Sequence, residues 1–117
     1  MVSATITASN GNWLRTQVLL DTGADSCVFP LTMAVLLKLD VFGLPKDVTG
    51  GVGTASNLTY YDDLRIELDG GLDFTVHAGF TAGLDPFGFG LLGQDGFFSC
   101  HHVEFRGSEG FFLVEPV

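Results

Sequence analysis

Apolar and polar residues alternate over short stretches of this chain, a pattern that predicts β-strands. Residues 3–8 alternate β-branched with small residues, and residues 13–20 follow them after the dipeptide at 10–11, Asn-Gly. Asn-Gly is a strong signal for a tight hairpin turn, so we expect these two stretches to pair. Residues 59–68 and 72–80 predict a second pair of strands, joined by an Asp-Gly-Gly turn.

Shorter elements fill the rest of the chain. A proline at position 30 closes one short strand and stands near the start of a helix. The expected elements are a strand over 26–29, a helix over 31–39, a glycine-rich hairpin over 46–58, a loop over 83–90, a strand at 91–92, a short helix over 93–99, and a last hairpin of 102–106 with 111–115. One or two short helices in an otherwise all-β chain predict a small closed β-barrel, formed by residues 1–117 as a single domain.

Composition supports a compact β-rich domain and argues against several classes of function. The chain is 46% hydrophobic with 16 Gly and 11 Phe, and its net charge is −9. Only five Lys and Arg are present, and they are scattered, which argues against a nucleic-acid partner. No apolar run approaches the ~20 residues that span a bilayer, and no signal peptide is apparent, so we expect no membrane partner and favour the cytoplasm. Cys27 and Cys100 are expected to be buried thiols, with a disulfide as the alternative.

One carboxylate stands where an apolar strand meets a glycine turn. The run Leu20-Asp21-Thr22-Gly23-Ala24-Asp25 resembles the active-site loop of retropepsins, the aspartic proteases of retroviral type. The resemblance implies that Asp21, Thr22 and Gly23 form the catalytic loop, that Thr22 locks two such loops together, and that no cofactor is needed. Alone, the triplet is equally compatible with an Asp that caps a turn.

Two further motifs strengthen the resemblance. Gly50-Gly51-Val52-Gly53 is similar to the tip of the retropepsin flap, a glycine-rich lid that brings backbone N–H groups to the substrate. It implies that Gly50, Gly51 and Val52 contact the peptide, although Thr54 stands where many family members have another glycine. Gly90-Leu91-Leu92-Gly93 resembles the segment that lies behind the catalytic loop.

The residue after that segment departs from the retroviral pattern. Retroviral enzymes usually have an Arg there, paired with the second Asp of the loop, whereas this chain has Gln94. The change removes a charge-assisted partner for Asp25, and Arg15 and Arg106 are its possible substitutes. It points to a cellular or bacterial relative rather than to a retroviral origin.

A single Asp-Thr-Gly triplet predicts a dimer. Two carboxylates held close share a proton, one activating water and the other acting as an acid, and this chain supplies only Asp21. We therefore expect a C2 homodimer in which the terminal segments 2–7 and 111–116 pair across the interface, with pairing inside one chain as the alternative. The expected substrate is an extended peptide with bulky apolar residues. Its predicted contacts outside the flap are Leu19, Gly23, Ala24, Asp25, Val28, Phe89 and Leu91.

Two other functions remain open from the sequence. The first is a catalytically inactive module that keeps the retropepsin fold for dimerisation or peptide binding. The second is a metal site at Cys100-His101-His102, but adjacent residues on a strand face opposite ways, so at most two of the three share a face. His77 lies in an apolar strand and is expected to be a strand residue rather than a catalyst.

Overall fold

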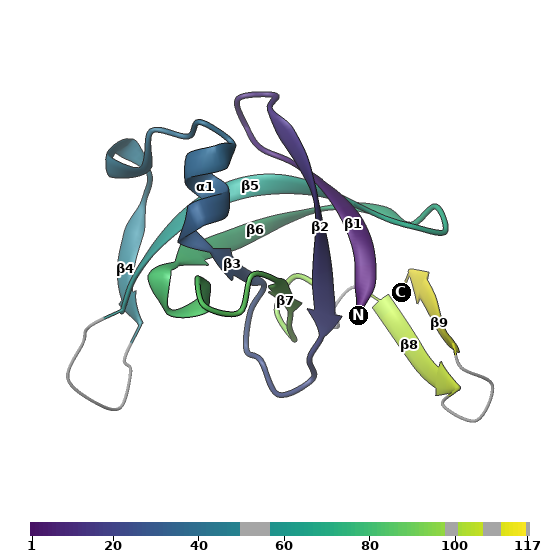
Figure 1. The fold of residues 1–117 in the computed structure, drawn as a ribbon. Coiled ribbons are helices and arrows are strands. Elements are labelled where there is room, and N and C mark those ends of the chain that lie inside the picture. The colour runs from purple at the N-terminus through teal and green to yellow at the C-terminus, as the bar shows by residue number, and fades with distance from the viewer. Residues whose placement is uncertain (50–56, 98–100, 107–110, 117) are drawn as a thin grey trace.

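Most of the chain forms a closed β-barrel (Figure 1). The computed structural model describes residues 1–49, 57–97, 101–106 and 111–116. Within these ranges six strands follow one another around the barrel in the order β1-β2-β7-β3-β6-β5, and β5 pairs with β1 to close it. Their bounds are β1 Val2–Thr7, β2 Trp13–Leu20, β3 Val28–Pro30, β5 Asn57–Leu68, β6 Asp73–Thr81 and β7 Gly90–Leu92. The prediction of a mostly β chain closed into a small barrel is confirmed.

Both predicted long hairpins are present. β1 and β2 are antiparallel, and Gly11 takes a φ of 87° in the turn between them. β5 and β6 are antiparallel over nearly their whole length, with Gly70 and Gly71 at φ values of 107° and 102°. Positive φ is accessible to glycine at little cost, which explains why the two turns carry this residue.

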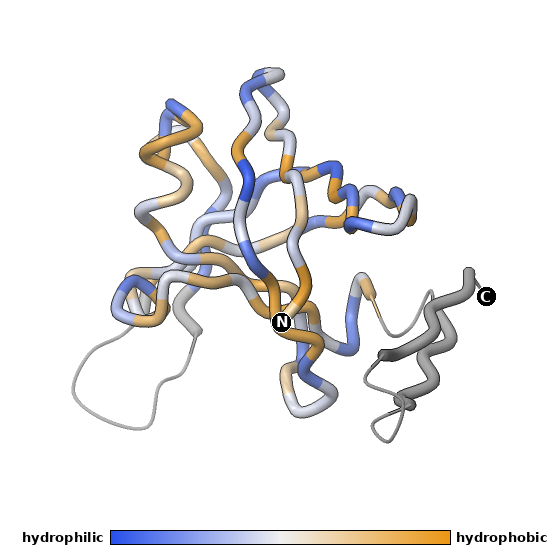
Figure 2. The backbone as a smooth tube through the Cα atoms, turned by 45° about the vertical axis from the view of Figure 1, so that its right-hand side comes forward, coloured by the Kyte–Doolittle hydropathy of each residue, from blue (hydrophilic) through white to orange (hydrophobic). Residues whose placement is uncertain are grey.

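The barrel interior is filled by the alternate apolar residues of the strands. Hydrophobic and hydrophilic residues alternate along the tube of Figure 2, as expected when one face of each strand is buried. Phe29 and Phe80 are fully buried, and their ring centroids lie 6.1 Å apart. A Cβ at Gly90 would lie only 2.5 Å from the Phe29 ring, so the ring fills the space that a side chain on β7 would need. The other fully buried apolar side chains include Ile6, Val18, Leu64, Ile66, Leu92 and Phe97.

The predicted helix over 31–39 is shorter than expected. Helix α1 covers Leu31–Leu36, and Pro30 occupies its N-cap position. Lys38 adopts the left-handed φ of 58°, and the N–H of Leu39 donates to the Ala34 carbonyl at 3.1 Å. This arrangement ends the helix in the manner of a glycine C-cap, although no glycine is present to mark it. Two single turns of 3-10 helix follow elsewhere, η1 at Val41–Gly43 and η2 at Ala82–Leu84.

The prediction of a helix over 93–99 is wrong for the described residues 93–97, which form a turn. The N–H groups of Gln94 and Asp95 donate to carbonyls of the chain near residue 25, and Asp95 forms an isolated bridge with Ser26. Gly96 then takes a φ of 96°, which a helix does not allow. Bonds to a distant segment have replaced the local helical bonds.

The N-terminal strand does not have the free edge that the predicted dimer interface requires. β1 pairs with β2 on one edge and, from Ala4 to Thr7, with β5 on the other. Most of β1 therefore has no edge left for a second chain, which corrects the expectation for residues 2–7. The last two strands, β8 (His101–Arg106) and β9 (Phe111–Pro116), form the predicted hairpin as a separate two-stranded sheet beside the barrel (Figure 1).

Among the described residues, no helix is both long enough and apolar enough to cross a membrane.

Candidate active site

The Asp21 carboxylate sits in a tight turn directly after β2. The N–H of Asp21 donates to the Leu92 carbonyl at 3.0 Å, which continues the parallel pairing of β2 with β7. The Gly23 N–H donates to Asp21 Oδ1 at 2.9 Å, and the Ala24 N–H donates to the Asp21 carbonyl at 3.1 Å. The carboxylate therefore does cap its turn, as the simpler interpretation expected, and this bond also fixes its orientation. Within the described residues, Oδ2 receives no such bond.

A second segment, residues 92–95, holds this loop from a distant part of the chain. The backbone N–H of Gln94 donates to the Ala24 carbonyl at 2.9 Å, and that of Asp95 donates to the Asp25 carbonyl at 2.8 Å. The side chain of Gln94 adds a third bond, from Nε2 to the Thr22 carbonyl at 2.8 Å. The loop is thus positioned by neutral amide donors bound to its backbone.

Gly93 allows the two segments to lie this close. A Cβ at this position would lie 2.4 Å from the Ser26 carbonyl oxygen and 2.6 Å from that of Ala24. Both are backbone atoms, so no side-chain rotation could relieve the clash. The glycine is therefore a requirement of the close approach between residues 93 and 24–26.

Of the two arginines considered as partners for Asp25, Arg15 is bound to another carboxylate. Nη2 of Arg15 donates to both carboxylate oxygens of Asp69, at 3.0 and 3.1 Å. The side chain of Arg106 lies outside the described residues. Asp25 is exposed, and its backbone carbonyl is the group that binds the supporting segment.

A pocket of about 330 Å³ opens beside the loop and includes two of the predicted contacts, Val28 and Leu91. These two residues pair across β3 and β7, so their side chains share one face of the sheet. The remaining lining residues were not predictable from the sequence, because a single sequence does not show which strands lie next to one another. They are Ser26, Thr59, Tyr61, Thr81, Gly83 and Leu84.

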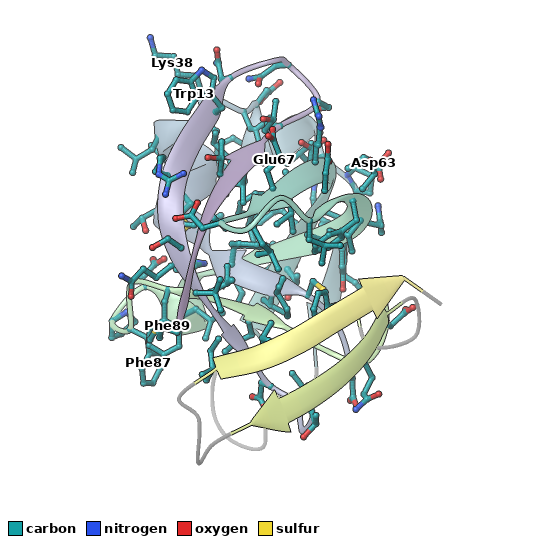
Figure 3. All side chains as sticks on the ribbon, turned by 90° about the vertical axis from the view of Figure 1, so that its right-hand side faces the viewer. Trp13, Lys38, Asp63, Glu67, Phe87 and Phe89 are labelled. Atoms are coloured by element: carbon teal, nitrogen blue, oxygen red, sulfur yellow. The ribbon has the colours of Figure 1, made fainter. Side chains whose placement is uncertain are left out.

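Other predicted contacts lie away from this pocket or outside the described residues. Leu19 is 36% exposed and lies beside Leu91 in the parallel pairing. Phe89 packs against Phe87, with ring centroids 6.0 Å apart, and Figure 3 shows the two labelled rings together at the surface. Among the described residues neither Leu19 nor Phe89 lines the pocket.

The base of the predicted flap is present as a hairpin. Strand β4 (Lys46–Thr49) pairs with the start of β5, from Lys46 with Tyr60 to Thr49 with Asn57. The Tyr61 N–H donates to the Pro45 carbonyl at 2.8 Å and fixes this base to the barrel. The predicted flap contacts Gly50, Gly51 and Val52, together with Thr54, lie outside the described residues.

A metal-binding group is not found among the described side chains, where no three His, Cys, Asp or Glu residues gather closely enough. The candidate at Cys100-His101-His102 falls outside those side chains. Cys27 is fully buried, and its Sγ lies 3.6 Å from the Asp95 carbonyl oxygen.

We also compared the chain with known proteins. It matches no protein-family model, no curated protein and no solved structure.

Proposed function

We propose that this chain is a retropepsin-like aspartic endopeptidase that acts as a homodimer on extended peptides with bulky apolar residues. The observation that carries the proposal is the Asp21 loop. Its carboxylate is oriented by one backbone N–H, its backbone is held by three donors from residues 94–95, and an apolar pocket opens beside it. The pocket lining begins at Ser26, directly after the loop, and does not include Asp21 itself. A carboxylate whose orientation is fixed by a backbone N–H can serve as a general base.

The proposed reaction needs two copies of Asp21. One carboxylate removes a proton from a water molecule, which attacks the peptide carbonyl, while the other, protonated, donates to the carbonyl oxygen or to the leaving amine. Two carboxylates placed close together share one proton, as is known for the aspartic-protease dyad. No metal or covalent intermediate is required by this scheme.

Other aspartates of the chain lack the required setting. Asp85 accepts the Thr32 N–H at 3.1 Å at the start of α1, and Asp95 lies in the turn that supports the loop. The second catalytic carboxylate therefore comes, in our proposal, from a second copy of the chain related by C2 symmetry. The β8–β9 hairpin supports this assembly, because within the described strands it is hydrogen-bonded only to itself. Outer edges of such a two-stranded sheet are suited to pairing with another chain.

A peptide library and the variant Asp21→Asn test the proposal. We expect the wild type to cleave peptides between bulky apolar residues, and Asp21→Asn to cleave none. Asp40→Asn is the matched control, because it makes the same chemical change at an exposed carboxylate outside the Asp21 loop. Cleavage that persists in Asp21→Asn would show that another group is responsible. Binding of the peptides without any cleavage by the wild type would favour the inactive module.

Mixing the two proteins tests whether the site is shared. If each site needs an Asp21 from both chains, an equal mixture that exchanges subunits freely should show about half the activity expected from its wild-type content. Sedimentation should show a dimer at the same concentration. An unreduced activity in a mixture that has exchanged would contradict the shared dyad.

A further inference from the structure

Three side chains on the outer face of β5 and β6 form a connected group. Tyr61 pairs with Gly79 across the two strands, and Asp63 pairs with His77 two residues further on. Residues two apart on a strand share a face, so Tyr61 and Asp63 on β5 lie on the same side as His77 and Gly79 on β6. Asp63 is labelled at the edge of the barrel in Figure 3, with its side chain directed outward.

The Tyr61 ring rests on the backbone of β6. A Cβ at Gly79 would lie 3.3 Å from Tyr61 Cε1 and 2.5 Å from the Thr59 methyl carbon, so these two side chains occupy the space above the glycine. The His77 ring stacks on the Tyr61 ring, with centroids 5.2 Å apart and planes inclined by only 9°. Tyr61 is thus confined from below by Gly79 and from one side by His77.

His77 is in turn held by Asp63. Its Nδ1 lies 2.9 Å from Asp63 Oδ1. Both side chains are more than half exposed, so the pair adds little to the stability of the barrel. Its effect is on orientation, because the bond fixes the plane of the imidazole against which Tyr61 stacks.

Tyr61 connects this group to the pocket. Tyr61 lines the pocket together with the aliphatic residues Val28, Leu84 and Leu91. The pocket volume of about 330 Å³ is at the lower end of the range for ligand sites, which suits one side chain of a peptide rather than a large ligand. A shift of the Tyr61 ring would directly change the size of the side chain that fits.

We propose that Tyr61 determines the specificity of this pocket, and that His77, held by Asp63, is the residue that positions the Tyr61 ring. The inference rests on the proposed function. The pocket then accepts branched aliphatic side chains of the substrate, and Tyr61 excludes aromatic ones.

The experiment compares two peptides that differ only in the pocket residue, Val or Phe, and measures the ratio of their kcat/KM values. Tyr61→Ala should raise the Phe-to-Val ratio by about tenfold, because the excluded volume is released. Tyr61→Phe should leave the ratio within about twofold, because the ring remains. His77→Ala should raise it by about threefold, the scale of one lost ring-stacking contact. His77→Phe should restore most of the wild-type ratio, since it keeps a ring to stack on.

The readout separates positioning from general damage. Loss of structure would lower kcat/KM for both peptides together, whereas loosening of Tyr61 changes their ratio mainly through KM. Thr75→Ala is the matched control, because Thr75 is exposed on β6 two residues before His77 and pairs with Arg65. It should leave the ratio unchanged.

The outcomes distinguish this inference from the function on which it rests. If the wild type cleaves but Tyr61→Ala keeps the wild-type ratio, Tyr61 does not determine specificity. If Tyr61→Ala fails to fold, the test rests on His77→Ala and His77→Phe, because they change an exposed residue. Equal Phe-to-Val ratios in these two variants and in the wild type overturn the positioning role of His77. If the wild type cleaves no peptide, the protease proposal fails and the inference falls with it.

Discussion

A substitution at Gly93 should displace the Asp21 loop, because this glycine packs directly against the loop backbone. The substitution Gly93→Ala would place a Cβ 2.4 Å from the Ser26 carbonyl oxygen, about 1 Å inside the 3.4 Å at which ordinary contact begins. Overpacking of this kind costs about 1–3 kcal/mol. The backbone must move apart, and the bonds from Gln94 and Asp95 to the loop carbonyls are then lost at about 1 kcal/mol each. We therefore expect a loss of about 3–5 kcal/mol in the free energy of unfolding.

Urea and thermal denaturation followed by circular dichroism measure this loss. For a domain of this size it corresponds to a fall in Tm of more than about 10 °C. Gly43→Ala is the matched control, because its Cβ would meet only the flexible carboxylate of Asp40, at 3.0 Å. That variant should lie within about 0.5 kcal/mol of the wild type. Equal stabilities for the two variants would refute the close-packing account of Gly93.

The same variant separates stability from activity. At a temperature where Gly93→Ala is still folded, the Asp21 loop should be displaced by a fraction of an ångström to an ångström. A displacement of this size costs about a hundredfold in rate when the displaced group is catalytic. Full activity in the folded variant would show that residues 92–95 do not position the Asp21 carboxylate for the proposed reaction.

Three further predictions concern other parts of the molecule. Lys38 has a φ of 58°, so Lys38→Gly should stabilise the protein by about 1 kcal/mol and raise Tm by about 4 °C, whereas Lys38→Ala should not; a thermal melt decides. The hydrogen bond from Arg65 holds the pKa of Asp73 below its ordinary value of 3.8, so the small stability that this pair adds is present at neutral pH and lost as pH falls through the lowered pKa. Wild type and Arg65→Gln should therefore differ in Tm at pH 7 and converge well below about pH 4; a constant difference would contradict this linkage. Peptide cleavage should be fastest at acidic pH, because one of the paired Asp21 carboxyls must stay protonated, and a flat rate profile up to about pH 8 would count against the shared proton.

The strands of the barrel could be predicted because their signals are local. Alternation of apolar residues and the glycine turns at positions 10–11 and 69–71 are each contained within a few residues, and they specify the two long hairpins. The closure of the barrel followed from the scarcity of helix. Its pairing scheme did not, because the sequence contains nothing that assigns β1 to both β2 and β5.

The errors in secondary structure have tertiary causes. The early end of α1 depends on Lys38 in a conformation that usually belongs to glycine, so the sequence had no stop signal before residue 40. The segment after Gly93 has donors that a helix could use, but Gln94 and Asp95 bond to the loop around residue 25 instead. A single sequence does not show which distant carbonyls are within reach.

The candidate site was only partly predictable for the same reason. The motif singled out Asp21, and the resemblance implied that Leu91 faces the pocket, where the structure places it. Thr59, Tyr61 and Thr81 could not be assigned to the pocket, because their place depends on the position of β5 and β6 beside β3. Once β5 is known to lie near β3, the alternation of its residues would identify Thr59 and Tyr61 as outward-facing pocket residues.

The bond between Gln94 and Thr22 spans 72 positions of the chain, and it has a consequence for the timing of folding. A ribosome that adds about 5–20 residues per second releases Gln94 roughly 4–14 s after Thr22. Throughout that interval the Asp21 loop lacks the three donors of residues 94–95 that hold its backbone. The candidate site therefore cannot be completed early in synthesis. The loop becomes ordered only when nearly all barrel strands have been synthesised.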